Sequence, residues 1–421
     1  MRALSHKTKP QLNTERLIID FNQLAAIGAT IEGGVSRLAL SNEDLEARAW
    51  LAEQFEQAGL VVHDDDAGNL SGILRSEQPD ARTLIIGSHL DTVPNGGRYD
   101  GSVGILGALE CVRCIQEAKI ELPFHLEIIN FTDEEGCWQS LFGSRALTGT
   151  LNKDYALTLN DDVGQFRAAL FRAGIRPSDV PRARRDPETV LGYLELHIEQ
   201  SYHLDEKKID IGVVTAIVGR STYMITFHGE ASHSGTTRTA DRRDALLGAA
   251  NFITEIHRTI RQRYPDGAVN CGNVTVEPGA FNIIPSQACI TVECRHSDRD
   301  MLDSMQNDLQ ALAQTISQQY GLEVEVNCRV QMPAAMLSGQ MILAAEEACQ
   351  RVGVSHMRLQ GLAGHDAQIM SSFTPTGMIF IPSVNGISHS PKEFTEWADV
   401  VKGVRVLLET IMVLAENAPR D

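Results

Sequence analysis

The chain has 421 residues and a formal net charge of −18, and at about 150 residues per domain its length suggests two or three domains. Nucleic-acid-binding proteins are usually basic, and an anionic membrane surface repels an acidic protein, so the charge argues against both as partners. We find no run of about 18 consecutive apolar residues. The polar N-terminus lacks the pattern of a signal peptide. We therefore expect a cytoplasmic protein.

Eight cysteines are scattered along the chain, which is not the pattern of a disulfide framework. Two of them, Cys111 and Cys114, form a C-x-x-C pair. They lie in GILGALECVRCIQEA, where apolar residues recur at helical spacing. We therefore expect buried helix cysteines rather than a redox or zinc motif.

The first half of the chain alternates between strand and helix patterns. The expected elements are, in order, a helix at 43–59, a strand at 83–90, a helix at 102–118 and a strand at 125–135. Apolar strands that alternate with helices predict an α/β fold, with a mostly parallel sheet and helices on both faces. In such sheets, sites form at the carboxyl ends of the strands.

The pattern changes near residue 215. The expected elements that follow are strands at 223–231, 270–279, 288–297 and 322–330, with helices at 239–263 and 301–321. Helices packed on an antiparallel sheet form an α+β unit. A helix at 341–353 and a strand at 377–383 then return to the first sheet. We expect a catalytic domain built from residues 1–215 and 331–421, with an inserted domain at 216–330.

The segment HLDTVPNGGRYDG contains a first group of candidate site residues. His89 and Asp91 lie two positions apart on an extended segment, so both can face the same side, and Asp91 could orient the His89 ring. A loop rich in Asn and Gly then leads to Asp100, whose two oxygens could bridge two metal ions. An isolated H-x-D segment is more typical of a polar turn at the end of a strand.

The second group is DEEG at 133–136. Adjacent carboxylates repel each other unless they share a cation or a proton. On an extended backbone Glu134 and Glu135 would face opposite ways, so that one binds metal while the other acts as a general base. The alternative is a solvated acidic loop. The apolar strand that precedes the pair argues against this interpretation.

Histidines in LELHIEQ, GEASHSGTT, AGHDA and SHSPKE complete the candidate set: His197, His233, His365 and His389. Zinc prefers histidine nitrogen and carboxylate oxygen as ligands. A metal pair about 3.5–4 Å apart can hold a hydroxide at neutral pH. The residues with suitable chemistry for such a pair are His89, Asp100, Glu135, His197 and His389.

In this order, HLDTVPNGGRYDG, TDEEG, LHIEQ, GEASHSGTT, AGHDA and SHSPKE resemble the N-carbamoyl-L-amino acid hydrolase and allantoate amidohydrolase family. This family belongs to the dizinc aminoacylase and carboxypeptidase superfamily, and the resemblance spans nearly the whole chain. It implies terminal metal ligands at His89 and Glu135, a bridging ligand at Asp100, and further ligands at His197 and His389. It also implies that Glu134 is the general base and that Asp91 supports a ligand.

The resemblance implies a second set of residues that act on the substrate. His233 would lie on a lid and dimerisation domain, reach the active site of a neighbouring subunit in a homodimer, and polarise the scissile carbonyl. Gln200, Asn282 and Arg295 match substrate-binding positions, and the planar fork of Arg295 suits a carboxylate. Gly364 matches a position that offers its backbone to the substrate.

Arg238 and Thr239 depart from the family pattern, which has Pro and Met after GTT. The departure bears on the lid and leaves the implied metal ligands unchanged. The implied activity is hydrolysis of an N-carbamoyl-L-amino acid by two divalent ions, zinc by preference, with manganese, cobalt or nickel as alternatives. Allantoate and β-ureidopropionate are alternative carboxylate-bearing substrates. A non-catalytic binding protein is a third reading, against which the intact Glu134 argues.

Overall fold

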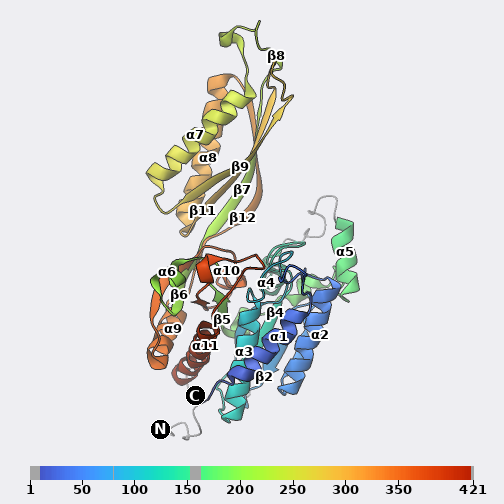
Figure 1. The fold of residues 1–421 in the computed structure, drawn as a ribbon, viewed down its shortest axis with the longest axis vertical. Coiled ribbons are helices and arrows are strands. Elements are labelled where there is room, and N and C mark those ends of the chain that lie inside the picture. The colour runs from blue at the N-terminus through green and yellow to red at the C-terminus, as the bar shows by residue number, and fades with distance from the viewer. Residues whose placement is uncertain (1–9, 79, 152–162, 419–421) are drawn as a thin grey trace. The chain divides into compact units, whose positions relative to one another are not determined.

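The structure is a computed structural model that describes residues 10–78, 80–151 and 163–418. The chain divides into two compact units (Figure 1). The first unit combines Met1–Thr215 with Leu337–Asp421, and the second unit is Ala216–Met336. Within the described ranges, no helix combines the length and the apolar content needed to cross a membrane.

The first unit is built on one large sheet. Its strands are β1 (Val61–Asp64), β2 (Leu70–Leu74), β3 (Thr83–His89), β4 (His125–Phe131), β5 (Val190–Ile198), β6 (Ile211–Ile217), β14 (His356–Gly361) and β15 (Thr376–Ile381). The strand order is β1-β2-β4-β3-β5-β15-β6, and β14 and the two-residue strand β13 (Ala335–Met336) also pair with β6. The central strands β4, β3, β5 and β15 are parallel, while β1, β2 and β6 pair antiparallel with their neighbours. The predicted α/β class is confirmed.

Helices accompany this sheet along the chain. They are α1 (Thr14–Ala26), α2 (Asn42–Gln57), α3 (Ser102–Glu117), α4 (Phe142–Thr148), α5 (Val163–Arg172), α6 (His203–Lys207), α9 (Gly339–Val352), α10 (Asp366–Met370) and α11 (Trp397–Asn417). Short 3-10 turns occur at Val180–Ala183, Pro187–Thr189 and Val384–Gly386. Cys111 and Cys114 are buried in α3, and all eight cysteines are free, as predicted.

Side chains of β5 alternate between the two faces of the sheet. Leu196 faces α3, which packs so closely that a Cβ at Gly107 would lie 3.1 Å from Leu196 Cδ2. Glu195 points to the other face, where its carboxylate accepts a hydrogen bond from the Ala367 N–H in α10. Because side chains alternate along a strand, His197 shares the face of Glu195. The sequence LELHI thus puts apolar side chains against α3 and polar ones on the face of α10.

The second unit is an antiparallel sheet with two helices. It contains β7 (Gly219–His228), β8 (Ser232–His233), α7 (Ala245–Arg263), β9 (Ala268–Glu277), β10 (Ile283–Ile284), β11 (Gln287–His296), α8 (Arg299–Tyr320), β12 (Glu323–Met332) and β13 (Ala335–Met336). The main sheet has the order β12-β7-β11-β9, and β8 and β10 form a separate ribbon. The β-α-β-β-α-β order is that of a split βαβ unit. Apolar side chains of the two helices and the main sheet form its core.

Helix α7 begins later than the sequence pattern predicts. The apolar spacing predicts a helix from 239, but α7 starts at Ala245. Asp244 has an extended backbone, and its side chain accepts a hydrogen bond from the Leu247 N–H at 3.1 Å. An aspartate that caps the first turn in this way fixes the residue at which the helix begins. A separate 3-10 turn forms at Thr239–Asp241, and Arg238 precedes it.

Candidate metal centre

The predicted metal ligands of the first unit lie at strand ends and in the loops that follow. His89 is the last residue of β3, and His197 is near the end of β5. Glu135 follows β4, Asp100 lies two residues before the start of α3, and His389 lies in the loop before α11. Because β3, β4 and β5 are parallel neighbours, their carboxyl ends share one edge of the sheet. The structure therefore brings together residues that are far apart in the sequence.

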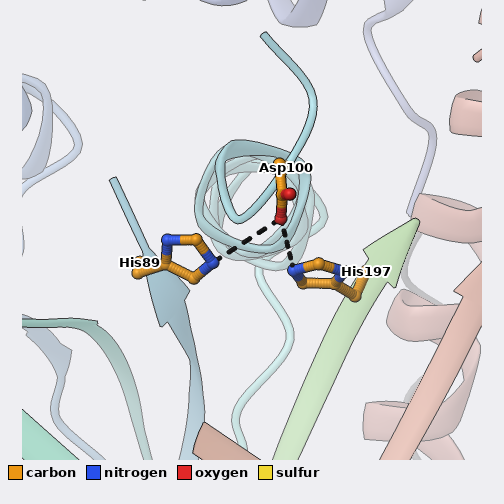
Figure 2. Close-up of side chains that lie close together, drawn as sticks. All are labelled: His89, Asp100 and His197. Atoms are coloured by element: carbon orange, nitrogen blue, oxygen red, sulfur yellow. Dashed lines mark ion pairs between the residues drawn. The ribbon is translucent and has the colours of Figure 1, made fainter. Parts of the chain in front are cut away.

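Asp100 lies at the centre of this group. Its Oδ1 is 3.1 Å from Nε2 of His197 and 3.7 Å from Nε2 of His89 (Figure 2). Its Oδ2 is 3.3 Å from Nε2 of His389, which is itself 3.4 Å from Oε2 of Glu135. Each oxygen of one carboxylate thus faces a different pair of ligand-type side chains.

Two groups of ligand-type side chains each have their ligand atoms close enough together to share an ion. The groups are His89, Asp100 and His197, and Asp100, Glu135 and His389, each with ligand atoms within 4.8 Å of one another. The two groups have Asp100 in common. Asp100 is thus the residue through which the two candidate ligand groups are connected.

The two buried histidines have the tautomer that a metal site needs. Nδ1 of His89 lies 2.9 Å from the backbone oxygen of Asp91, and Nδ1 of His197 lies 2.9 Å from that of Ile198. A carbonyl oxygen can only accept a hydrogen bond, so Nδ1 carries the proton in both rings. Nε2 of each ring faces Asp100 and is the nitrogen that would bind a cation after losing any proton it carries. The donor set therefore fits a cation, which would take the place of such protons between the rings and the carboxylate.

Glu195 and His365 lie behind His197 and form a third group of ligand-type atoms with it. The His365 ring packs edge-on against that of His197, with centroids 4.5 Å apart. Both nitrogens of His197 already face other partners, Asp100 and Ile198. His197 therefore cannot serve a further cation in this group, and we read Glu195 and His365 as support for it.

The acidic pair of DEEG does not have the extended geometry that the sequence suggested. Strand β4 ends at Phe131, and Asp133 adopts a left-handed backbone with φ of 56°. Glu134 and Glu135 consequently turn to the same side and form one group with His89. The prediction that the two carboxylates face opposite ways was wrong, because the chain leaves the strand before it reaches them.

Asp133 is a residue whose role the sequence did not reveal. Its buried carboxylate accepts hydrogen bonds from the backbone N–H groups of Trp138, at 3.0 Å, and Gln139, at 2.6 Å. Burial raises the pKa of Asp133 to about 7. These bonds close the loop that carries Glu134 and Glu135. The only signal in the sequence was the position of Asp133 as the first acid of DEEG.

The electrostatics of the centre also favour bound cations. Burial, and then repulsion by neighbouring carboxylates, raises the pKa of Glu134 and Glu135 well above the ordinary value. Burial would also raise the pKa of Asp100, but hydrogen bonds from His197 and His389 hold it well below the usual range. Buried carboxylates this close together need protons or cations to offset their repulsion.

The two predicted substrate-binding residues of the first unit flank this centre. Gln200 has a left-handed backbone with φ of 56°, and its Nε2 donates a hydrogen bond to Oδ2 of Asp100 at 2.8 Å. Gly364 is exposed and directly precedes the buried His365 at the start of α10. Gln200 therefore contacts the centre directly, whereas Gly364 lies beside a residue that packs on His197.

The predicted substrate residues of the second unit lie on two of its strands and one loop. His233 is exposed at the end of β8. The neighbouring Ser234 N–H donates to the backbone oxygen of Asn282 at 3.0 Å, so His233 and Asn282 lie on one small ribbon. Arg295 is on β11, where its Nε donates to Oε1 of Glu293 at 2.7 Å. That these three side chains act at the metal centre stays a prediction.

A mostly parallel α/β sheet that carries ligand groups of this type at its strand ends is suited to binding metal ions. The chain belongs to peptidase family M20/M25/M40, whose family model matches residues 85–413. This match agrees with the superfamily that the six motifs resemble.

The relatives include several amidohydrolases. The chain is 34% identical to the N-carbamoyl-L-amino-acid amidohydrolase of Pseudomonas sp. strain NS671, over 95% of this chain and 98% of the relative. It is 31% identical to the allantoate amidohydrolase of Bacillus subtilis, over 97% of this chain and 99% of the relative. A solved amidase of the hydantoinase/carbamoylase family from Burkholderia multivorans superposes with a TM-score of 0.83 at 33% identity, covering 96% of this chain and 98% of that one. The resemblance predicted from the motifs is confirmed.

Proposed function

We propose that the protein is a metal-dependent amidohydrolase that cleaves a C–N bond of an N-carbamoyl-L-amino acid. The observation that carries this proposal is the position of Asp100, with one oxygen facing His89 and His197 and the other facing His389. The names of the relatives support a ureido substrate. The products would be the amino acid, ammonia and carbon dioxide.

Two divalent cations would share Asp100. His89 and His197 would complete one site, and Glu135 and His389 would complete the other. Zinc suits a mixed set of imidazole and carboxylate ligands, and manganese, cobalt or nickel can use the same donors. When bound, such a pair lowers the pKa of a water molecule and polarises a carbonyl group.

Glu134 would be the general base. Its side chain is buried, with Oε2 3.7 Å from Nε2 of His89. Burial, together with the nearby charge of Glu135, raises the pKa of Glu134 well above that of an exposed glutamate, which makes it a stronger base. Glu134 would take a proton as the water oxygen bonds to the ureido carbon. As the C–N bond breaks, the nitrogen would leave with the electron pair and receive that proton.

Other residues would bind the substrate. Gln200 and the backbone at Gly364 would contact it from the first unit. From the second unit, Arg295 would bind its carboxylate, Asn282 would hydrogen-bond to it, and His233 would stabilise charge on the carbonyl oxygen. Because His233 would act on the site of a partner subunit, we propose a homodimer. We further propose a cytoplasmic enzyme that needs neither nucleic acid nor a membrane as a partner.

The test is an ammonia-release assay over a panel of N-carbamoyl-L-amino acids, allantoate and β-ureidopropionate. The metal-free protein should be inactive, and zinc, manganese, cobalt or nickel should restore turnover. Glu134→Gln should keep its bound metal and lose about 10²- to 10⁴-fold in turnover. Full activity after removal of all metal, or in Glu134→Gln, would contradict the proposal.

Allantoate is the second candidate substrate, because the relatives include an allantoate amidohydrolase at 31% identity. The chemistry at the metal centre would be the same, and the pocket for the rest of the substrate would differ. Turnover of allantoate alone in the same panel would decide for this alternative. Full activity in a strictly monomeric preparation would refute the proposed role of His233 across subunits.

A further inference from the structure

Glu393 is a buried carboxylate between the loop before α3 and the loop before α11. Its Oε1 accepts hydrogen bonds from the backbone N–H groups of Tyr99, at 2.9 Å, and Asp100, at 3.0 Å. Its Oε2 accepts one from the Ser388 hydroxyl at 3.0 Å. We propose that Glu393 is a positioning residue that sets the affinity of the metal centre by holding Asp100 and the loop of His389 together. This inference rests on the proposed metal sites.

The bonds to Tyr99 and Asp100 act on the backbone that carries the shared ligand. Asp100 has to direct one oxygen to His89 and His197 and the other to His389. Its direction depends on where its backbone lies at the start of α3. Two hydrogen bonds to one carboxylate oxygen fix that backbone, one of them through the N–H of Asp100 itself.

Ser388 extends the connection to the second group of ligands. Its hydroxyl lies 3.0 Å from Oε2 of Glu393 and 3.0 Å from Oδ2 of Asp100. A hydroxyl has one proton, so it can donate to only one of the two carboxylates at a time. The next residue, His389, has a left-handed backbone with φ of 53°, a conformation that the surrounding contacts have to maintain. Glu393 thus anchors the loop in which His389 lies.

Gly97 shows how closely the carboxylate fits. A Cβ built at Gly97 would overlap the carboxylate carbon and both carboxylate oxygens of Glu393. Glycine at this position therefore leaves room for Glu393 to reach the amides of Tyr99 and Asp100. Glu393 belongs to neither of the two ligand groups, so its effect would pass through Asp100 and His389.

The experiment compares zinc binding by metal-free wild type, Glu393→Ala and Glu393→Gln, using competition with a chromogenic chelator. Glu393→Ala should bind zinc about 10- to 100-fold more weakly, as expected when a residue that supports a metal ligand is removed. Glu393→Gln should stay within about threefold of wild type, because its amide oxygen can still accept from both backbone N–H groups. The melting temperature of each metal-free variant separates weaker binding from loss of the fold.

Two controls test the proposed mechanism. Glu396→Ala removes the same kind of side chain from the same loop, and Glu396 is exposed and makes no capping hydrogen bond, so its zinc affinity should not change. Gly97→Ala should weaken zinc binding in the wild-type background and have much less effect in Glu393→Ala. When two substitutions act through the same contact, their effects on zinc affinity do not add.

Wild-type zinc affinity in Glu393→Ala would overturn the inference, and so would Glu393→Gln binding as weakly as the alanine variant. If Glu393→Ala did not fold, Gly97→Ala would carry the test, because its Cβ would displace the Glu393 carboxylate: weaker zinc binding supports the inference, and unchanged binding overturns it. A wild-type protein that binds no zinc, manganese, cobalt or nickel would instead show that the proposed metal sites are wrong.

Discussion

The carboxylate of Asp91 accepts a hydrogen bond from the backbone N–H of Glu135, with Oδ2 and the nitrogen 3.1 Å apart. Oδ1 of the same carboxylate lies 3.4 Å from the backbone nitrogen of Glu134. The His89 ring meets the backbone oxygen of Asp91 at 2.9 Å, whereas the carboxylate is 3.7 Å away. Asp91 therefore supports His89 through its main chain and the acidic pair through its side chain.

Replacing Asp91 should thus disturb the proposed base as well as the metal ligands. We expect Asp91→Ala to lower kcat/KM by about 10- to 100-fold, since this is the usual effect of removing a residue that orients a metal ligand. Asp91→Asn keeps one acceptor oxygen and should lose less. Kinetics in the ammonia assay, with zinc content measured in parallel, provide the check. Equal kcat/KM for Asp91→Ala and wild type would show that the two backbone bonds do not matter.

Arg37 is a buried cation beneath the same edge of the sheet. Its side chain is 1% exposed. Nε donates to the backbone oxygen of Leu90 at 2.7 Å, and Nη1 donates to those of Leu24, at 3.1 Å, and Ile27, at 3.0 Å. Burial lowers the pKa of Arg37 to about 10, so it remains charged at neutral pH. One guanidinium thus ties the end of α1 to the residue between His89 and Asp91.

We expect Arg37→Met to lower the free energy of unfolding by about 3 kcal/mol, because carbonyl groups lose their donors inside the protein. Arg37→Lys should recover only part of this, since an ammonium lacks the planar fork that reaches several carbonyl groups. Urea unfolding measures both. Arg176→Met, at an exposed position, serves as the control and should change stability by less than about 0.5 kcal/mol. A loss below about 1 kcal/mol for Arg37→Met would contradict the assigned role.

The parallel strands could be read from the sequence, and so could the gathering of ligand-type residues at their carboxyl ends, because both follow local rules; that these residues bind metal stays a prediction. The apolar run before His89 forms β3, the run before Thr132 forms β4, and parallel strands bring their carboxyl ends together. Helix α11 was not predicted, although its apolar residues recur at helical spacing. Residues 152–162 lie outside the described part of the chain.

Contacts between residues far apart in the sequence could not be predicted from the sequence. A single arginine such as Arg37 usually lies on the surface. No residue near it in the sequence indicates that its side chain donates hydrogen bonds to three backbone carbonyl groups. Glu393 is 293 positions from Asp100, so local spacing does not indicate their hydrogen bond. The left-handed backbone at Asp133 was also hidden, since non-glycine residues seldom adopt it. That turn decides where Glu134 and Glu135 point.

Gly101 should tolerate no side chain. Its φ is +64°, and a Cβ there would lie 2.6 Å from ring atoms of His89 and would also collide with its backbone oxygen. We expect Gly101→Ala to weaken zinc binding by at least about 10-fold, since it would displace a ligand ring, and to destabilise the fold by about 1–2 kcal/mol through backbone strain. Gly339→Ala is the matched control, because nothing lies within 4 Å of a Cβ there. Normal zinc affinity in Gly101→Ala would mean that the ring of His89 can move without consequence.

Zinc binding should release protons at neutral pH. Burial opposes the charged form of His197, but the hydrogen bond and the charge of Asp100 outweigh it and raise the pKa of His197 to about 9. The metal-free protein therefore carries a second proton on this ring near pH 7, at Nε2 beside Asp100. Zinc needs the lone pair that this second proton occupies. Zinc affinity should accordingly rise with pH until about pH 9, above which His197 is already neutral.

Calorimetric titrations with zinc near pH 7, in buffers of different ionisation enthalpy, measure this release directly. The slope of the observed enthalpy against the buffer enthalpy should correspond to about one proton or more per protein, because bound metal requires deprotonated ligands. In His197→Gln the contribution of the ring disappears, so the slope should fall by about one proton. A slope of zero for the wild type, with zinc bound, would show that Asp100 does not hold His197 in its charged form. The link drawn between the charge of Asp100 and the ring of His197 would then be wrong.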